Sequence, residues 1–184
     1  MTDEARGVWM YQSFLSGKLC EPIVDFDREF TKLVDQLWRS MDFYKGVGLA
    51  APQVGIFFQV AVIQVRDTDP LVITNPKWKP LTAGVTAESE GCLSMPGRGF
   101  RALVKRYNRV QLDYYDVDGC KRELEATGML ARAIQHECDH LVGKFFFDHL
   151  PSLQRKMLIQ KLRKNLKEWR RREKRPSATM LGKR

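Results

Sequence analysis

The sequence of 184 residues lacks the features of a membrane or secreted protein. No run of apolar residues approaches the roughly 20 that a membrane-spanning helix needs. Residues 1–6 are already acidic and are not followed by the apolar core of a signal peptide. An Arg- and Ser-rich transit peptide is not evident either. We therefore expect a cytoplasmic location, or an organelle matrix if a transit peptide has been removed, and no membrane partner.

Cysteine is scarce, and the four cysteines form no C-x-x-C pair. They are Cys20, Cys92, Cys120 and Cys138. In a reducing compartment this pattern indicates free thiols or a metal ligand rather than a disulfide framework.

Basic charge is concentrated at one end of the chain. The net charge is +9, yet residues 151–184 hold 13 Lys or Arg against 2 acidic residues, so residues 1–150 are nearly neutral. A helix beginning at Ser152 and ending before Pro176 is predicted from apolar residues at four-, four- and three-residue spacing. These are Leu158, Leu162, Leu166 and Trp169. Its basic face could bind RNA or an anionic surface, or could be the solvated side of a helix packed on its own domain.

Two further helices are predicted. Apolar residues at helical spacing follow Asp25 and Asp27, either of which could cap a helix that ends before Gly46. A second helix is expected from Thr127 to about Val142, with Gly143 as its stop signal.

Between these helices the sequence favours short strands. We expect strands at 59–65, 71–74, 102–104 and 108–115, with Asn75-Pro76 as a stop after the second. Asp118-Gly119 should turn the chain into a hairpin with 121–126. This order predicts an α+β fold in which antiparallel β-sheets surround a central helix, with an N-terminal helix and a C-terminal basic helix.

The central helix carries the strongest chemical signal. The stretch 134–141 has the sequence IQHECDHL, which contains two of the three histidines. Residues four apart lie on one helix face, so His136 and His140 can ligate one divalent metal ion, and Glu137 can take a proton from water beside it. The alternative is a pair of surface histidines with this spacing by accident. Two imidazoles do not complete a site, so a third ligand must come from elsewhere.

Cys92 is a candidate for that third ligand. It lies in the stretch 90–97, EGCLSMPG, where a thiolate could bind a borderline metal. The alternative is a small buried core residue. Cys138 lies two positions from each histidine and should point away from the metal. Asp139 is expected to pair with a base such as Arg106, and His149 to pack or face solvent.

Three segments together resemble the peptide deformylases, whose pattern is G-x-G-L-A-A-x-Q, then E-G-C-L-S, then Q-H-E-x-D-H. The chain has GVGLAAPQ at 46–53, EGCLS at 90–94 and QHECDH at 135–140. The resemblance implies a hydrolase that removes the formyl group from the N-terminal formyl-methionine of nascent chains. It implies one divalent metal, most often Fe2+, with Zn2+, Ni2+ or Co2+ as substitutes.

The resemblance also assigns roles to individual residues. It implies metal ligation by Cys92, His136 and His140, with Glu137 as general acid and base. Gln53 and the backbone N–H of Leu93 match the donors that stabilise the developing oxyanion. The glycine-rich segment matches the part that pairs with the substrate backbone. Its residues are Gly46, Val47 and Gly48.

The pocket for the methionine side chain should draw on residues before His136. Met129 and Val47 are plausible apolar lining, together with Ala133. Arg132 departs from an apolar pocket. It could narrow the pocket, lay its stem along the wall or meet Glu88. Formyl-methionyl peptides remain the expected substrates.

The domain plan follows from the same observations. Residues 1–150 should form one catalytic domain, and residues 151–184 a basic helix and tail. Some deformylases dock on the ribosome through such a helix, so the ribosome is a candidate partner. Two other classes share parts of the pattern: an endopeptidase of the zincin type, and a basic RNA- or ribosome-binding module with a degenerate enzyme body.

Overall fold

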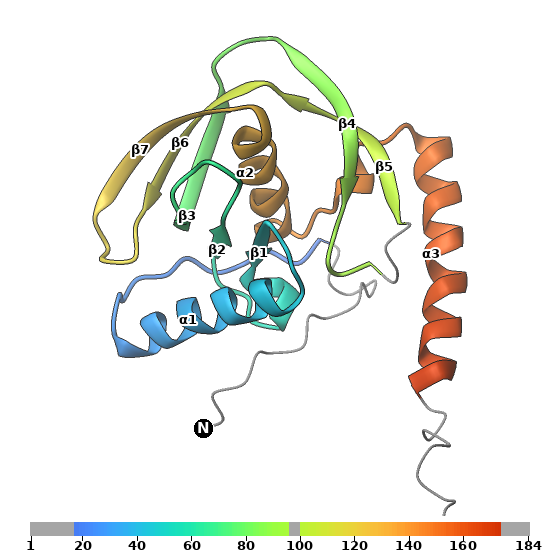
Figure 1. Cartoon of the computed structure of the whole chain (residues 1–184), viewed down its shortest axis with the longest axis horizontal. Helices are drawn as coiled ribbons and strands as arrows, with labels where there is room; N and C mark the ends of the chain where they lie inside the picture. Colours follow the sequence, from blue (N-terminus) through green and yellow to red (C-terminus); the bar gives the residue numbers. More distant parts are fainter. Residues whose placement is uncertain (1–16, 96–99, 174–184) are drawn as a thin grey trace, which may run out of the picture.

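The computed structural model describes residues 17–95 and 100–173, with side chains as far as Glu168. Figure 1 shows helices and strands wrapped around one central helix, α2. In chain order the elements are α1 (Arg28–Phe43), β1 (Gly48–Ala50), the 3-10 helix η2 (Ala51–Val54), β2 (Val60–Ile63), β3 (Leu71–Pro80), β4 (Val85–Gly91), β5 (Arg101–Tyr107), β6 (Arg109–Tyr115), β7 (Lys121–Thr127), α2 (Gly128–Leu141), the 3-10 helix η3 (Phe146–His149) and α3 (Ser152–Glu173).

The strands form two separate antiparallel sheets. Five strands pair in the order β1-β2-β3-β6-β7, and β4 pairs only with β5. The axis of α2 runs between the two sheets (Figure 1). The predicted α+β architecture with antiparallel sheets, a central helix, an N-terminal helix and a C-terminal helix is therefore confirmed. No helix in the described ranges is long and apolar enough to cross a membrane.

Strand β2 is covered on both faces, which explains its uninterrupted apolar sequence. Val60 and Val62 belong to the core beneath α1, whereas Ala61 and Ile63 belong to the core beneath α2. Successive side chains of a strand point to opposite faces, so four consecutive apolar residues supply two cores. This arrangement fixes α1 and α2 on opposite sides of the same strand.

Helix α1 begins and ends as predicted from its sequence. The Asp27 carboxylate accepts the backbone N–H groups of Glu29 at 2.9 Å and Phe30 at 3.0 Å, which satisfies two donors at the helix start. The apolar face is buried against β1 and β2. Its buried residues are Phe30, Val34, Leu37, Ser40 and Met41.

The predicted stop at Asn75-Pro76 is wrong. Strand β3 continues to Pro80 because the register shifts between Thr74 and Lys77, and this irregularity leaves Pro76 outside the hydrogen-bonded ladder. Asn75 adopts a φ of +49°, and its side chain binds both backbone groups of Ile23. Strand β4 was not predicted, because most of its residues are polar or small and only Glu90 among them is buried.

The two ends of α2 follow the predicted signals. Thr127 occupies the N-cap position, although its side chain makes no capping hydrogen bond. At the other end Gly143 has a φ of +69°, and a Cβ there would lie 2.6 Å from the backbone nitrogen of Gly17. Gly143 thus allows the chain to reverse while residues 17–20 pass close to the helix end.

Helix α3 packs on the rest of the chain through one face. Leu162 is fully buried, and three neighbours contact the same cluster of aromatic and aliphatic residues around η3. These neighbours are Leu158, Ile159 and Leu166. The side chain of Trp169 and the predicted stop at Pro176 lie outside the described residues. The packed alternative for this helix therefore holds for its apolar face, while its basic residues up to Lys167 are exposed.

Replacing Leu162 with Ala should lower the free energy of unfolding by about 2–5 kcal/mol, because a fully buried leucine leaves a cavity. Urea unfolding followed by circular dichroism measures this change. Leu153→Ala in the same helix is the control: Leu153 is 69% exposed, so its loss should change stability by less than about 0.5 kcal/mol. Equal stability of the two variants would show that α3 does not contribute to the core.

Candidate metal centre

Three side chains converge at the position predicted for a metal ion. The ligand atoms of Cys92, His136 and His140 all lie within 4.8 Å of one another, and Cys92 Sγ is 3.3 Å from His140 Nε2. Both histidines come from one face of α2, with ring centroids 4.9 Å apart. Cys92 follows directly after β4. Among the described residues this is the only group of three or more such side chains with this geometry.

Each imidazole is held by its other nitrogen. His136 Nδ1 lies 3.0 Å from Glu90 Oε2, and His140 Nδ1 lies 3.1 Å from the carbonyl oxygen of Lys144. Both partners are acceptors, so Nδ1 carries the proton in each ring and Nε2 is left as the ligand atom. The turn after α2 brings Lys144 O to His140, because Lys144 N binds Asp139 O at 2.8 Å.

The electrostatics favour a thiolate. Burial by itself would raise the pKa of the Cys92 thiol, but His140 and His136 outweigh it and lower the pKa to about 5. Burial likewise opposes a charge on His136, yet hydrogen bonds to Cys92 and Glu90 raise its pKa to about 10. The site therefore stabilises a negatively charged sulfur next to positive charge. A cation bound to the thiolate would supply that positive charge in the same place.

Glu137 lies beside the cluster in a closed environment. It is buried, and burial is the main reason why its pKa is raised. Its Oε2 atom is buried and has no hydrogen-bond partner within the described part of the chain. A Cβ on Gly48 would lie 2.9 Å from Glu137 Cδ and closer still to Oε1. The missing side chain of Gly48 therefore makes room for this carboxylate.

Gln53 joins the cluster from η2. Its Oε1 accepts the backbone N–H of Ala50 at 2.9 Å, which orients the amide so that Nε2 donates to Cys92 Sγ at 3.3 Å and to Ser94 Oγ at 3.2 Å. Leu93 lies next to Gly46, since a Cβ on that glycine would meet Leu93 Cδ1 at 2.8 Å. The structure thus brings the glycine-rich segment and the EGCLS segment together around the two histidines.

The donor set fits a metal ion. One thiolate and two imidazoles suit Zn2+ or Fe2+ and not Mg2+ or Ca2+, which require oxygen ligands. Three protein ligands leave a further coordination position for a small molecule. The unpartnered Oε2 of Glu137 is a buried polar atom that a water molecule in that position would satisfy.

Sequence reasoning missed the residues that support the histidines. Glu90 accepts from Arg106 through both oxygens, at 3.0 Å each, and from Arg132 Nη1 at 2.6 Å. Burial alone would raise the pKa of Glu90, but the hydrogen bonds and charges of His136 and Arg106 outweigh it and lower the pKa to about 2. Glu90 lies two residues before Cys92. On an extended strand, side chains two residues apart point to the same face. That spacing is the signal that could have identified it.

A second carboxylate extends this network. Asp139 pairs with Arg106 Nη1 at 2.5 Å, as predicted, and also lies 2.6 Å from His149 Nε2. The expectation that His149 only packs or faces solvent was therefore incomplete. Cys138 is buried in the core beneath α2 and, as predicted, is not part of the metal cluster.

The predicted substrate-binding residues differ in exposure. Val47 and Met129 are 53% and 50% exposed, whereas Ala133 is buried. Arg132 is buried and directs its guanidinium to β4, where Nε lies 3.3 Å from Glu88 Oε2. Of the three arrangements considered for Arg132, contact with Glu88 is the one observed.

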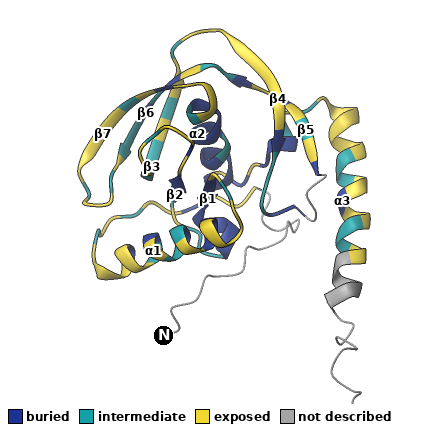
Figure 2. Ribbon diagram, viewed as in Figure 1, coloured by how far each residue is buried: buried dark blue, intermediate teal, exposed yellow. Residues whose placement is uncertain are grey.

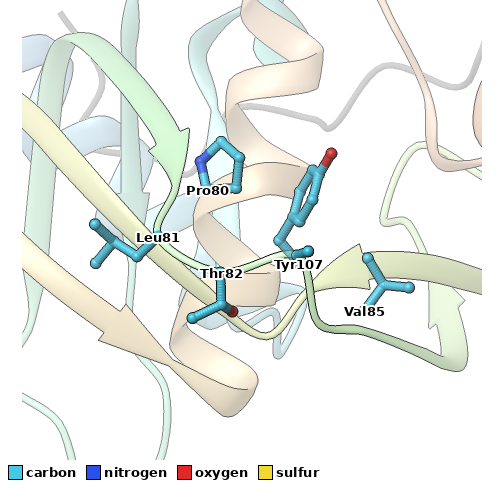
Figure 3. A pocket seen from close by; sticks show the side chains of 6 residues that line it. Pro80, Leu81, Thr82, Val85 and Tyr107 are labelled. Atoms are coloured by element: carbon cyan, nitrogen blue, oxygen red, sulfur yellow. The ribbon is translucent and has the colours of Figure 1, made fainter.

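A separate surface pocket lies at the connection from β3 to β4. It has a volume of about 510 Å³, and Figure 3 shows its lining side chains. The lining residues are Pro80, Leu81, Thr82, Ala83, Val85 and Tyr107. None of the predicted catalytic, substrate or metal residues is among them, so this pocket is not part of the candidate centre.

A buried glutamate beside a convergent thiolate and two imidazoles, in this α+β fold, defines a metal-dependent hydrolase. The sequence profile of the polypeptide deformylase family matches residues 8–156. The chain is 41% identical to the peptide deformylase of Stutzerimonas stutzeri (strain A1501) over 148 residues, which is 79% of this chain and 87% of that protein. The chain belongs to the polypeptide deformylase family.

Solved structures agree with this assignment. The peptide deformylase of Thermus thermophilus superposes with a TM-score of 0.82 at 32% identity, covering 91% of this chain and 99% of that chain. The peptide deformylase of Synechococcus elongatus, solved in complex with actinonin, gives a TM-score of 0.78 at 32% identity and covers 88% of this chain and 89% of that chain. Deformylation of nascent polypeptides is the known function of this family. The predicted hydrolase activity is therefore confirmed. The two alternative classes, an endopeptidase and an RNA-binding module, are not favoured.

Gly48→Ala should lower kcat/KM on a formyl-methionyl peptide by about 100-fold, because the new methyl group must displace Glu137. Gly84→Ala is the matched control, since a Cβ there meets only side-chain atoms, Asn108 Nδ2 at 3.2 Å and Thr82 Oγ1 at 3.7 Å, away from the centre. Circular dichroism verifies that both variants fold. A folded Gly48→Ala enzyme with normal kcat/KM would refute the assigned role of Gly48.

Proposed function

We propose that the chain removes the formyl group from N-formyl-methionyl nascent peptides with a single divalent metal held by Cys92, His136 and His140. The observation that carries this proposal is the approach of the three ligand atoms to within 4.8 Å of one another beside Glu137. When bound there, the ion would act as a Lewis acid. It would lower the pKa of a water molecule so that hydroxide is available as a nucleophile near neutral pH.

We infer that the ion is Fe2+, the metal that the family resemblance favours. A thiolate and two imidazoles would also accept Zn2+, Ni2+ or Co2+. The thiolate of Cys92 would cancel part of the positive charge of a bound ion. Glu90 and Lys144 O accept the Nδ1 protons of the two histidines, so each ring can offer Nε2 to the ion as a neutral ligand.

Glu137 is the proposed general acid and base. Its buried carboxylate has a raised pKa, which brings it closer to the range in which a carboxylate can both accept and return a proton. In the proposed reaction it accepts a proton from the attacking water and delivers that proton to the departing nitrogen. Formate and the free amino terminus of the peptide are the products.

Two donors are proposed to stabilise the negative charge that develops on the formyl oxygen. The amide of Gln53 is oriented toward Cys92 by its bond to Ala50 N, and the backbone N–H of Leu93 follows Cys92 in the chain. Each such donor contributes on the order of 3–4 kcal/mol to transition-state stabilisation.

The substrate is proposed to lie along the glycine-rich segment. Gly46, Val47 and Gly48 would pair with its backbone, and Gly48 brings that segment into contact with Glu137. Met129 and Ala133, with the stem of Arg132, would line the methionine pocket. The guanidinium of Arg132 is bound to β4, so it does not place an unpaired charge in this pocket.

The decisive experiment measures formate release from a formyl-methionyl tripeptide. A strong chelator should abolish release, and added Fe2+ or Co2+ should restore it. Glu137→Gln should retain metal binding but lower kcat by about 10²- to 10⁴-fold, because the proton carrier is lost.

Glu123→Gln provides the matched control, because Glu123 is an exposed residue of β7 away from the centre. It should have the wild-type kcat. Formate release that survives complete metal removal, or a Glu137→Gln enzyme with normal kcat, would disprove the proposed mechanism.

We propose in addition that α3 docks the enzyme on the ribosome. The enzyme would then act in the cytoplasm or in an organelle matrix. The support is that one face of α3 is buried while much of the described helix is exposed (Figure 2), including its basic residues up to Lys167. Those exposed residues include Lys156, Lys161, Arg163, Lys164 and Lys167. A basic surface on a nearly neutral body suits the phosphate backbone of RNA.

Reversing charge at Lys156, Lys164 and Lys167 to Glu should weaken co-sedimentation with ribosomes at least about tenfold at low salt, without changing turnover of a short peptide. Charge reversal at Lys79, Lys105 and Lys121, exposed on the sheets, is the control for general electrostatic attraction. If both triple variants bind ribosomes equally well, docking through α3 is excluded.

A further inference from the structure

Strand β4 carries the cysteine ligand at its end but has almost no apolar attachment to the rest of the fold. Only Glu90 of its residues is buried, and Figure 2 shows most of the strand exposed. Its backbone pairs with β5 alone. Cys92 itself packs against the cluster around η3 and accepts from Gln53, so the contacts that join β4 directly to α2 are polar and add to these in placing Cys92 relative to the histidines.

Arg132 supplies most of those contacts. It lies one helical turn before His136, on the same face of α2. Its guanidinium binds three alternate residues of β4: Nη2 donates to Thr86 O at 3.0 Å, Nε lies 3.3 Å from Glu88 Oε2, and Nη1 lies 2.6 Å from Glu90 Oε1. Nη1 also donates to Val104 O of β5 at 3.0 Å.

Arg132 and His136 thus hold the same carboxylate from one helix. Glu90 Oε1 accepts from Arg132, while Oε2 accepts from His136 Nδ1 at 3.0 Å. The planar guanidinium spreads five N–H donors over three nitrogens, whereas an ammonium has three donors on a single nitrogen and an apolar side chain has none. Loss of the guanidinium would leave Glu90 as the link from β4 to α2, through His136 directly and through Arg106 to Asp139, and would loosen the rest of the strand.

We propose that Arg132 is a positioning residue for the metal centre: by fixing β4 on α2 through Glu90, it sets the distance between Cys92 and the two histidines and so determines metal affinity. This role goes beyond lining the methionine pocket. It rests on the proposed metal site, and the binding of Co2+ to the wild-type protein tests that site separately.

The test measures the Kd of Co2+ by competition with a chromophoric chelator. Arg132→Met keeps an unbranched apolar stem and removes the guanidinium, and it should raise the Kd about 10- to 100-fold, the range typical for groups that support metal ligands. Arg109→Met is the matched control, because it removes an exposed Arg–Glu pair between β6 and β7 that touches no residue of the centre. Its Kd should stay within about twofold of the wild type.

A double-mutant cycle distinguishes positioning from a general loss of stability. In the Glu90→Gln background, Arg132→Met should change the Kd by less than about threefold, because the contact through which it acts is already weakened. Additive losses would show that Arg132 acts by another route and would overturn the proposal. A folded Arg132→Met protein with the wild-type Kd would also overturn it.

Arg132→Lys keeps the test decisive if Arg132→Met does not fold. An ammonium can still pair with Glu90 but cannot also reach Thr86, Glu88 and Val104, so the Kd should rise about three- to tenfold. An unchanged Kd in this variant would overturn the proposal. If the wild-type protein itself bound no Co2+, the proposed metal site would fail instead.

Discussion

The candidate metal centre depends on the contact between two elements that are distant in sequence, β4 and α2. A thiolate at the end of an exposed strand must reach two imidazoles on a buried helix, and Cys92 Sγ comes within 3.3 Å of His140 Nε2. A helix alone can align two ligands at i and i+4, but no local rule places the third. Long-range contacts between β4 and α2 supply that placement, and the buried carboxylate of Glu90 lies at their centre.

The use of buried charge at this junction has a physical cost and a purpose. Glu90, Arg106 and Arg132 are each buried, and a buried charge is tolerated only when its partners compensate for lost hydration. Here both carboxylate oxygens of Glu90 have partners with defined directions. An apolar contact would hold β4 as firmly but could not orient the imidazole of His136. The network therefore combines attachment of a strand with control of a ligand.

Much of this arrangement could be predicted from the sequence, for reasons that differ between elements. The helices were predictable because Asp27 and Gly143 mark their ends and their apolar residues recur at helical spacing. The two histidines of the candidate metal centre were predictable because a short motif fixes their spacing on a helix, whereas Cys92 became the third candidate only through its segment and the family resemblance. Strand β4 was not, since an exposed strand has no apolar pattern, and the continuation of β3 past Pro76 depends on a register shift that only the sheet reveals. The contact of Arg132 with Glu88 was one of the alternatives considered, whereas its contacts with Glu90 and Thr86 join residues more than 40 positions apart and were not predicted.

The packing of α3 has a consequence for how the enzyme would meet a large partner. Leu158 and Leu166 share one hydrophobic cluster with Phe146 and with Cys92 itself. The helix is therefore packed against the residues that surround the candidate metal centre, and it is not attached to the domain by a flexible linker alone. Any partner that binds the basic side of α3 would therefore hold the candidate metal centre in one fixed orientation, and that orientation would decide which chain ends can reach the centre.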